Sequence, residues 1–159
     1  MSEIKFRGKR VDNGEWAYGY YVMNYFSPRL FESHQEFEYY IYKGAFDAVK
    51  NAVKYEVIPE TVGQYTGLKD KNGLTEVYEG DILSIENPGC QIQKATTLGL
   101  VAFNYCAWYL VNLESIVWQK YRVPAPTKRD SMLFATMIGC KEIEVIGNIH
   151  ENPELLESK

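Results

Sequence analysis

The chain has 159 residues, of which 46% are hydrophobic and 24% are charged, and its formal net charge is −4. This length allows one domain or two small ones, and the composition is ordinary for a globular protein. The negative charge excludes a general attraction for phosphate backbones, so nucleic-acid binding would need a local basic patch. Tyrosine is abundant, with 13 copies against 7 Phe and 3 Trp. Because tyrosine favours strands with half-solvated faces, the composition predicts a mainly β protein.

Three features predict a cytoplasmic location. The three cysteines, Cys90, Cys106 and Cys140, are odd in number and form no CxxC pair, which is typical of reduced thiols in a cytosolic protein. The first ten residues lack the apolar run of a signal peptide. No apolar run in the sequence is long enough to cross a bilayer, so we expect no membrane contact.

The chain is predicted to begin with a β-hairpin formed by residues 4–10 and 15–22. Apolar and charged residues alternate in the first run, and aromatic residues occupy alternate positions of the second. The dipeptide Asn13-Gly14 between them predicts a two-residue type I′ turn with both residues at positive φ. Gly19 interrupts the second strand, where it indicates either a bulge or the close approach of a neighbouring backbone.

A strand, one helix and a short strand complete the predicted N-terminal part. The run FEYYIY at residues 37–42 has the composition of a strand. Residues 44–54 carry apolar side chains at positions 46, 49 and 53, a spacing that predicts a helix. Residues 55–58 return to strand and end at Pro59. The N-terminal part is therefore predicted to be a hairpin and short helix that cap the rest of the protein.

The middle of the chain alternates short strands with glycine turns. Strands are predicted at residues 62–65, 75–78 and 81–86. Asn72-Gly73 repeats the hairpin dipeptide, and Asp70 is placed to bond the backbone two residues further on. Gly80 provides a second tight turn, after which Asp81 is expected to accept backbone N–H groups. We therefore expect positive φ at Gly73 and Gly80.

The last third is predicted to be rich in strands and to end in a tail that folds back. Strands are expected at 98–105, 108–113 and 142–149, with 115–123 as a further candidate and 131–140 open between helix and strand. Gly147 permits a neighbouring element to approach closely. Residues 153–156 form a helical turn, and Leu155 and Leu156 are costly to leave in water. We expect this pair to pack back onto the protein, with docking on a partner or a second copy as the alternative.

Three stretches resemble the YopX family of phage and prophage proteins, and they fall in the family's order. They are EIKFRGKRVDNGEW (Glu3–Trp16), VGQYTGLKDKNGLTEVYEGDIL (Val62–Leu83) and EVIGNIHENPELL (Glu144–Leu156). The resemblance implies a phage origin, a bacterial host cell and a largely β fold, and it implies no activity. It also implies an SH3-like barrel in the C-terminal part. We therefore expect a hairpin-and-helix subdomain at 1–60 and an SH3-like β-barrel with a terminal helical turn at 61–159.

The positions that carry the resemblance in the second and third stretches are expected to be structural. Glycine, asparagine and aspartate are frequent among them, and these residues define turns and close backbone approaches. They are Gly63, Gln64, Tyr65, Thr66, Gly67, Leu68, Asp70, Gly73, Tyr78, Glu79, Gly80, Asp81, Gly147, Asn148, Asn152 and Pro153.

No catalytic, cofactor-binding or metal-binding residue is predicted. Paired carboxylates can share acid and base roles or bind a hard cation, and the acidic residues of the middle stretch are Asp70, Glu76, Glu79 and Asp81. The spacing is not that of a calcium loop, because Gly73 is the fourth residue from Asp70 and not the sixth. No glycine-rich phosphate loop occurs. A non-enzymatic protein is therefore favoured, and a carboxylate-dependent hydrolase is a weaker alternative.

Six residues of the first half are candidates for contact with a partner: Lys5, Arg7, Lys9, Tyr18, Tyr20 and Tyr39. The three basic residues alternate along one strand and therefore share a face, and Arg10 follows them. Tyrosine is enriched at the hot spots of protein–protein interfaces. The alternatives are a solvated strand face for the basic residues and a surface covering for the tyrosines.

The sequence therefore favours a non-enzymatic binding or adaptor module that acts through protein–protein contacts. The partner would be a phage or host protein, or a second copy of the chain. An accessory protein that contacts nucleic acid through the basic N-terminal strand is the alternative. Small SH3-like barrels support many unrelated functions, so the expected fold by itself names no ligand.

Overall fold

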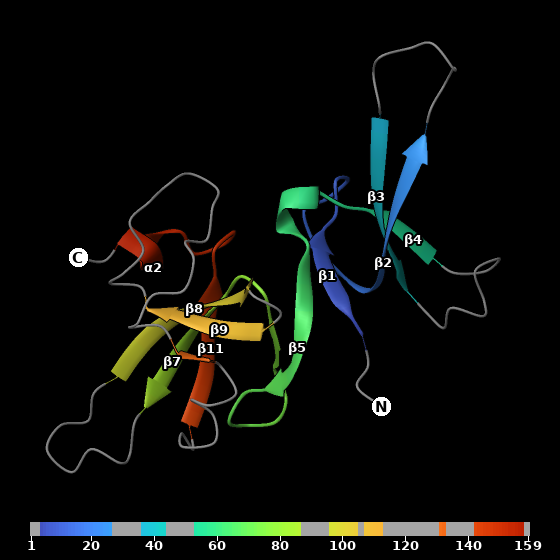
Figure 1. Ribbon diagram of the computed structural model, residues 1–159. Helices are drawn as coiled ribbons and strands as arrows, with labels where there is room; N and C mark the ends of the chain where they lie inside the picture. Colours follow the sequence, from blue (N-terminus) through green and yellow to red (C-terminus); the bar gives the residue numbers. More distant parts are fainter. Residues whose placement is uncertain are drawn as a thin grey trace, which may run out of the picture. The chain divides into compact units, whose positions relative to one another are not determined.

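The computed structural model describes residues 4–26, 36–43, 53–86, 96–104, 107–112, 131–132 and 142–157. The chain divides into two compact units, Met1–Tyr65 and Thr66–Lys159 (Figure 1). Most of the described residues lie in antiparallel strands, and a short 3-10 helix and a short α-helix accompany them. The predicted mainly β class is confirmed. Within the described ranges, no helix combines the length and apolar character needed to span a membrane.

The first sheet has the strand order β4-β3-β2-β1-β5-β6. Its strands are β1 (Phe6–Lys9), β2 (Trp16–Phe26), β3 (Glu36–Lys43), β4 (Val53–Glu56), β5 (Gly63–Lys69) and β6 (Glu76–Tyr78). The short helix η2 (Pro59–Thr61) lies between β4 and β5. The long ribbon of β2 and β3 is the most extended pairing of this sheet (Figure 1).

The first hairpin forms as predicted, but its turn is longer than expected. β1 pairs antiparallel with β2, and Lys9 lies opposite Trp16. A two-residue turn at Asn13-Gly14 would pair Asp12 with Glu15. Instead the N–H of Arg10 donates to the carbonyl of Glu15, so residues 11–14 form a four-residue loop. The type I′ prediction is therefore wrong, although Gly14 has a positive φ of 73°.

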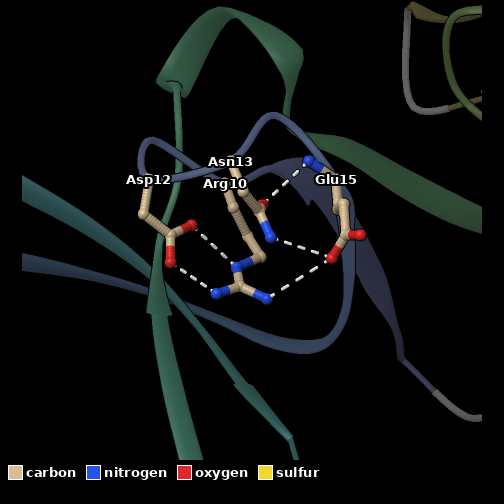
Figure 2. Close-up of polar contacts among 4 residues, drawn as sticks. All are labelled: Arg10, Asp12, Asn13 and Glu15. Atoms are coloured by element: carbon tan, nitrogen blue, oxygen red, sulfur yellow. Dashed lines mark hydrogen bonds and ion pairs between the residues drawn. The ribbon is translucent and has the colours of Figure 1, made fainter.

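Side-chain contacts of Arg10 explain the longer loop. Its guanidinium lies between Asp12 and Glu15, and a two-residue turn would instead pair these two residues with each other. Arg10 binds both carboxylates, and Asn13 accepts the N–H of Glu15 and donates to its carboxylate (Figure 2). The four-residue loop shifts the pairing of β1 with β2 by two residues relative to the predicted register. Because side chains alternate with a period of two, every side chain keeps its predicted face. The local dipeptide signal therefore identified the turn but not its length.

The helix predicted at 44–54 is contradicted at its C-terminal end. Residues 44–52 lie outside the described residues, while Val53 and Lys54 belong to β4 and pair with Lys43 and Tyr42. The β-branched Val53 suits a pleated, paired strand. Pairing with β3 therefore decides the conformation here, and apolar spacing over a short segment is the weaker signal.

The core of the first unit lies on one face of its sheet. The buried residues Ala17, Ile41 and Val57 form it, and Phe6, Tyr39, Tyr55 and Val62 pack against them. Gly19 lies on the same face, because it pairs directly with Phe6. A Cβ at Gly19 would lie 2.0 Å from the carbonyl oxygen of Tyr42. The predicted close approach at Gly19 is therefore confirmed, and the approaching backbone is β3.

The second sheet has the strand order β10-β9-β8-β7-β11 and supplies the core of the second unit. Its strands are β7 (Asp81–Glu86), β8 (Thr96–Asn104), β9 (Ala107–Asn112), β10 (Ser131–Met132) and β11 (Glu142–Asn148). Consecutive residues of β7 enter different apolar clusters, with Leu83 in one and Ile82 in the other. Since consecutive strand residues point to opposite faces, both faces of this sheet are covered.

The described strands form two open sheets and no closed barrel, so the predicted SH3-like barrel is not shown. Closure would need the edge strands β10 and β11 to pair with each other. The strand considered at 115–123 lies outside the described residues. Of the ambiguous segment at 131–140, only Ser131–Met132 are described, and they form the strand β10.

The C-terminal tail packs back on the second sheet, as predicted. The helix α2 (Glu154–Glu157) carries Leu155 and Leu156 against the cluster of Ile82, Leu100, Ala102 and Val111. Ile149 packs against the same cluster. The tail therefore covers apolar surface that the sheet would otherwise expose to water.

Two asparagines hold the turn between β11 and α2. The Oδ1 atom of Asn152 accepts the N–H of Asn148 at 3.3 Å, and the N–H of Asn152 donates to the carbonyl of Asn148 at 2.9 Å. Oδ1 of Asn148 accepts the N–H groups of His150 and Glu151. A Cβ at Gly147 would lie 2.5 Å from Oδ1 of Asn152. The predicted close approach at Gly147 is therefore confirmed.

Candidate functional site

One face of the first sheet gathers basic and aromatic side chains from four strands. Arg7 pairs with Tyr18 and Lys9 with Trp16, and directly paired residues of antiparallel strands share a face. The same ladder continues from Tyr20 to Tyr42 and on to Lys54. Lys5 precedes β1, is bonded through its carbonyl to the N–H of Tyr65, and is placed on this face by alternation with Phe6. We call this surface the tyrosine–lysine face and define it as Lys5, Arg7, Lys9, Trp16, Tyr18, Tyr20, Tyr40, Tyr42 and Lys54.

The basic residues of β1 lie against the aromatic ring of Trp16. The guanidinium carbon of Arg7 is 4.6 Å from the ring centroid, and Nζ of Lys9 is 5.4 Å from it. Such cation–π contacts contribute about 0.5–2 kcal/mol, with the larger values at desolvated sites. Arg7 is only 6% exposed, whereas Lys5 and Lys9 are half-buried. The basic row is therefore an ordered part of the sheet, with Arg7 beneath its surface.

The tyrosines of β3 are ordered by similar contacts. Nζ of Lys54 lies 4.3 Å from the ring centroid of Tyr40, and Tyr42 meets Tyr40 edge to face at 6.4 Å. The hydroxyl of Tyr40 donates to the carboxylate of Glu38 at 3.2 Å. Partial desolvation raises the pKa of Tyr40, and the hydrogen bond to Glu38 adds to the shift. The hydroxyl therefore stays protonated and keeps its hydrogen bond to Glu38.

The structure brings together five of the six predicted contact residues and separates the sixth. Lys5, Arg7, Lys9, Tyr18 and Tyr20 belong to the tyrosine–lysine face, where Tyr18 is 43% exposed. Tyr39 pairs with Met23 on the opposite face, stacks on Tyr21 at 6.4 Å and packs against the core of the first unit. Burial raises the pKa of Tyr21 in the same aromatic row.

Four members of the face were not among the predicted contact residues: Trp16, Tyr40, Tyr42 and Lys54. The alternation of Trp16 with Tyr18 and Tyr20 was visible in the sequence. The face of Tyr40 and Tyr42 depends on the register between β2 and β3. A slip of one residue would move both side chains to the opposite face of the sheet. The helix predicted at 44–54 includes Lys54, so the sequence does not indicate its place beside Tyr42.

Arg10 does not belong to the basic row, because its charge is neutralised at the hairpin turn (Figure 2). Its guanidinium binds Asp12 with two hydrogen bonds and pairs with Glu15 at 3.7 Å. The same group lies 4.3 Å from the ring centroid of Tyr55. The hydrogen bonds to Asp12 raise the pKa of Arg10, and those to Arg10 lower the pKa of Asp12.

Asp70 bonds the backbone of its own turn, whereas Glu76 accepts a hydrogen bond from the hydroxyl of Tyr78 at 2.6 Å. Oδ1 of Asp70 accepts the N–H groups of Asn72, Leu74 and Thr75. Partial burial alone would raise the pKa of Asp70, but the hydrogen bonds, with those from Thr75 first, outweigh it and lower the pKa. This arrangement fixes a turn in which Gly73 has φ 70°, so the positive φ predicted there is confirmed.

The second turn uses Asp81 in the same way. Asp81 is buried, and its Oδ2 accepts the N–H of Tyr78 at 2.8 Å. Gly80 has φ 82°, as predicted, and its N–H and carbonyl bond Val101 and Ile149. Glu79 accepts the N–H of Phe103 at 3.4 Å. Both carboxylates therefore accept backbone N–H groups, as expected for Asp81.

The first residues of the middle stretch connect neighbouring strands. Gly63 and Gln64 pair with Arg7 and Phe6, and the N–H of Tyr65 donates to the carbonyl of Lys5. The hydroxyl of Thr66 donates to the carbonyl of Val77 at 2.8 Å and accepts the N–H of Leu68. Gly67 has φ 86°, which explains why glycine stands there. Outside the middle stretch, in the C-terminal tail, the carbonyl oxygen of Pro153 accepts the N–H of Leu156.

In the part of the chain that the structure describes, no group of three or more His, Cys, Asp and Glu side chains is placed to hold a metal ion. The absence of metal binding and of a cofactor stays a prediction.

Fold and surface together define an antiparallel β protein of two units with an aromatic and basic sheet face. The chain belongs to the YopX family, because the family model described as YopX protein matches residues 5–157. Among solved structures, protein EF1440 from Enterococcus faecalis is similar, with 25% sequence identity, 98% of this chain and 99% of that chain covered, and a TM-score of 0.46. No curated protein matches the sequence.

Proposed function

We propose that the protein is a non-enzymatic binding or adaptor module that takes a protein partner through the tyrosine–lysine face. The observation that carries this proposal is the exposure of Tyr18, at 43%, within a face where other aromatic rings are already ordered by basic residues. Ordered aromatic side chains lose little conformational entropy on binding, and tyrosine and tryptophan dominate interface energies. The partner is a phage or host protein.

The test is capture of partners from lysates of the bacterial host by the intact protein and by a variant of the face. We expect Tyr18→Ala with Tyr20→Ala to reduce recovery of a captured protein by about ten-fold or more, as for a hot spot. Met23→Ala is the matched control, because Met23 is 54% exposed on the opposite face of the same strand. Equal recovery by both variants, with unchanged melting temperatures, would contradict the proposal.

A nucleic-acid-associated role is the second candidate. It is favoured by one observation, the adjacency of the basic row of β1 and the aromatic row of β2, whose register pairs Lys9 with Trp16. Proteins that bind single strands combine basic grooves with aromatic stacking platforms. Binding of a labelled oligothymidine that weakens steeply with salt would support this role.

We also propose the finer features of fold and location that the family resemblance implies. The second unit is proposed to be an SH3-like barrel, supported by five short antiparallel strands in which the last, β11, returns to pair with the first, β7. The domain division at 1–60 and 61–159 is proposed with it. The protein is proposed to be of phage or prophage origin and to act in the host cytoplasm.

A further inference from the structure

We infer that the tyrosine–lysine face takes an acidic, extended polypeptide segment that lies along β1 and β2. This inference rests on the proposed function and names the chemistry of its partner. The face carries four basic residues, Lys5, Arg7, Lys9 and Lys54, and its acidic neighbours by register on β3 and β4 are Glu36, Glu38 and Glu56. Among the described residues of this face, basic side chains therefore outnumber acidic ones, in a chain whose net charge is −4.

The charges of β1 have a spacing that an extended peptide can match. Lys5 and Lys9 are four residues apart on one face, so their Cα atoms are separated by roughly 13 Å along the strand. An extended peptide has the same rise, so acidic residues at positions i and i+4 reach both lysines. Arg7 lies between them and is buried against Trp16. Arg7 therefore places a positive charge beneath the bound segment and makes no direct contact with it.

The aromatic rings favour a peptide over a nucleic-acid strand. Arg7 and Lys9 already lie over the ring of Trp16, and Lys54 lies over the ring of Tyr40. At these two rings a stacking base would have to displace the cations, because base binding uses the face of the ring. Carboxylates instead approach the cations from outside and leave the cation–π contacts in place.

The acidic side chains of the same face also favour a peptide over a nucleic-acid strand. Glu38 holds the hydroxyl of Tyr40, and Glu56 pairs directly with Tyr40. A nucleic-acid strand carries a charge at every phosphate and would meet repulsion there. A peptide can place its carboxylates beside Lys5 and Lys9 and neutral residues beside the glutamates. Electrostatic complementarity of this kind sets the register of a partner.

The test uses defined probes with the full chain and measures fluorescence anisotropy. One probe is a labelled peptide of about 16 residues with Glu at every fourth position among Gly and Ser, and its control has Gln in place of Glu. A labelled oligothymidine of about 15 nucleotides is the second probe. We expect the Glu peptide to bind more tightly than the other two and its binding to weaken at about 0.5 M salt.

Variants assign the binding to the face. We expect Lys5→Gln with Lys9→Gln to weaken binding of the Glu peptide by about ten-fold or more. Lys43→Gln is the matched control, since Lys43 is exposed and lies on the opposite face of the same sheet, next in sequence to Tyr42. We expect it to change binding by less than about two-fold.

Three results would overturn the inference. They are tighter binding of oligothymidine than of the Glu peptide, equal binding of the Glu and Gln peptides, and equal losses in the two lysine variants. The proposed function fails separately, through the capture experiment with the Tyr18 and Tyr20 variant. If that variant loses its partner while the Glu peptide does not bind, the face is a protein-binding site and only the acidic chemistry is wrong.

Discussion

At the residue scale, Asp70 shows how a carboxylate that invites a catalytic interpretation instead fixes a turn. Its Oδ1 accepts three backbone N–H groups, of Asn72, Leu74 and Thr75. A charged acceptor makes such hydrogen bonds stronger than a neutral one does. The carboxylate of Asp70 therefore stabilises the turn together with the backbone hydrogen bonds that Asp70 makes with Gly73 and Thr75.

The first prediction concerns the pH dependence of this turn. The pKa of Asp70 is lowered in the folded protein, so its contribution to stability is present above the unfolded pKa and is lost as the pH falls through the folded pKa. Asp70→Asn keeps the shape and removes the charge. We expect the wild type to be more stable at neutral pH and the difference to shrink towards low pH, in urea unfolding at a series of pH values. A difference that does not vary with pH would show that charge is not what Asp70 provides.

The second prediction separates two reasons for glycine. At Gly73, φ is 70° and a Cβ would meet no described atom within 4 Å, so Gly73→Ala should cost only the conformational strain, about 1–2 kcal/mol. At Gly19, a Cβ would lie 2.0 Å from the backbone of Tyr42. Gly19→Ala should therefore force β2 and β3 apart and cost about 3 kcal/mol or more. Denaturant unfolding of both variants tests the order, and a larger cost at Gly73 would contradict it.

At the element scale, the tail α2 is a clasp whose attachment combines polar and apolar contacts. The turn of Asn148 and Asn152 sets its direction, and Gly147 provides the room for that turn. Leu155 and Leu156 then cover one of the two apolar clusters of the second sheet. Termini usually fray, so the contacts of this tail are what keep it in place.

The third prediction is that deletion of residues 151–159 destabilises the protein without changing its oligomeric state. Removing the two half-buried leucines should cost about 2 kcal/mol in total. The measurements are the melting temperature and the molar mass by light scattering. A milder variant, Leu155→Ala with Leu156→Ala, keeps the turn and should account for most of the loss. An unchanged melting temperature, or loss of an oligomer with the fold intact, would contradict the clasp.

At the scale of the whole molecule, each unit has apolar clusters of its own. Ala17, Ile41 and Val57 form that of the first unit, while Leu83, Trp108 and their neighbours form one cluster of the second. The boundary between the units falls within β5, after Tyr65. A separate core is the physical requirement for a part that folds by itself.

The fourth prediction is that residues 61–159 unfold cooperatively when expressed alone. This fragment keeps β5 whole and contains the buried Trp108, and Trp118→Phe leaves Trp108 as its only tryptophan. We expect a blue-shifted tryptophan emission that changes in one sigmoidal thermal transition. The full chain carrying Trp16→Phe and Trp118→Phe is the control. A broad, non-cooperative change in the fragment alone would contradict the proposed domain division.

The sequence by itself determined the β class, the first hairpin, the turns at Gly73 and Gly80, the close approaches at Gly19 and Gly147, and the packing of the tail. The turns depend on local chemistry, because glycine and asparagine define them through their nearest neighbours in the chain. At Gly19 and in the tail, the residue type alone indicates that a neighbour must approach, and the fold supplies that neighbour from a distant part of the chain. Tertiary structure decided the length of the first turn, the strand at Val53 and the faces of Tyr39 and Tyr40. Those features depend on register between strands, and register is set by residues distant in sequence, so one residue of slip exchanges core and surface.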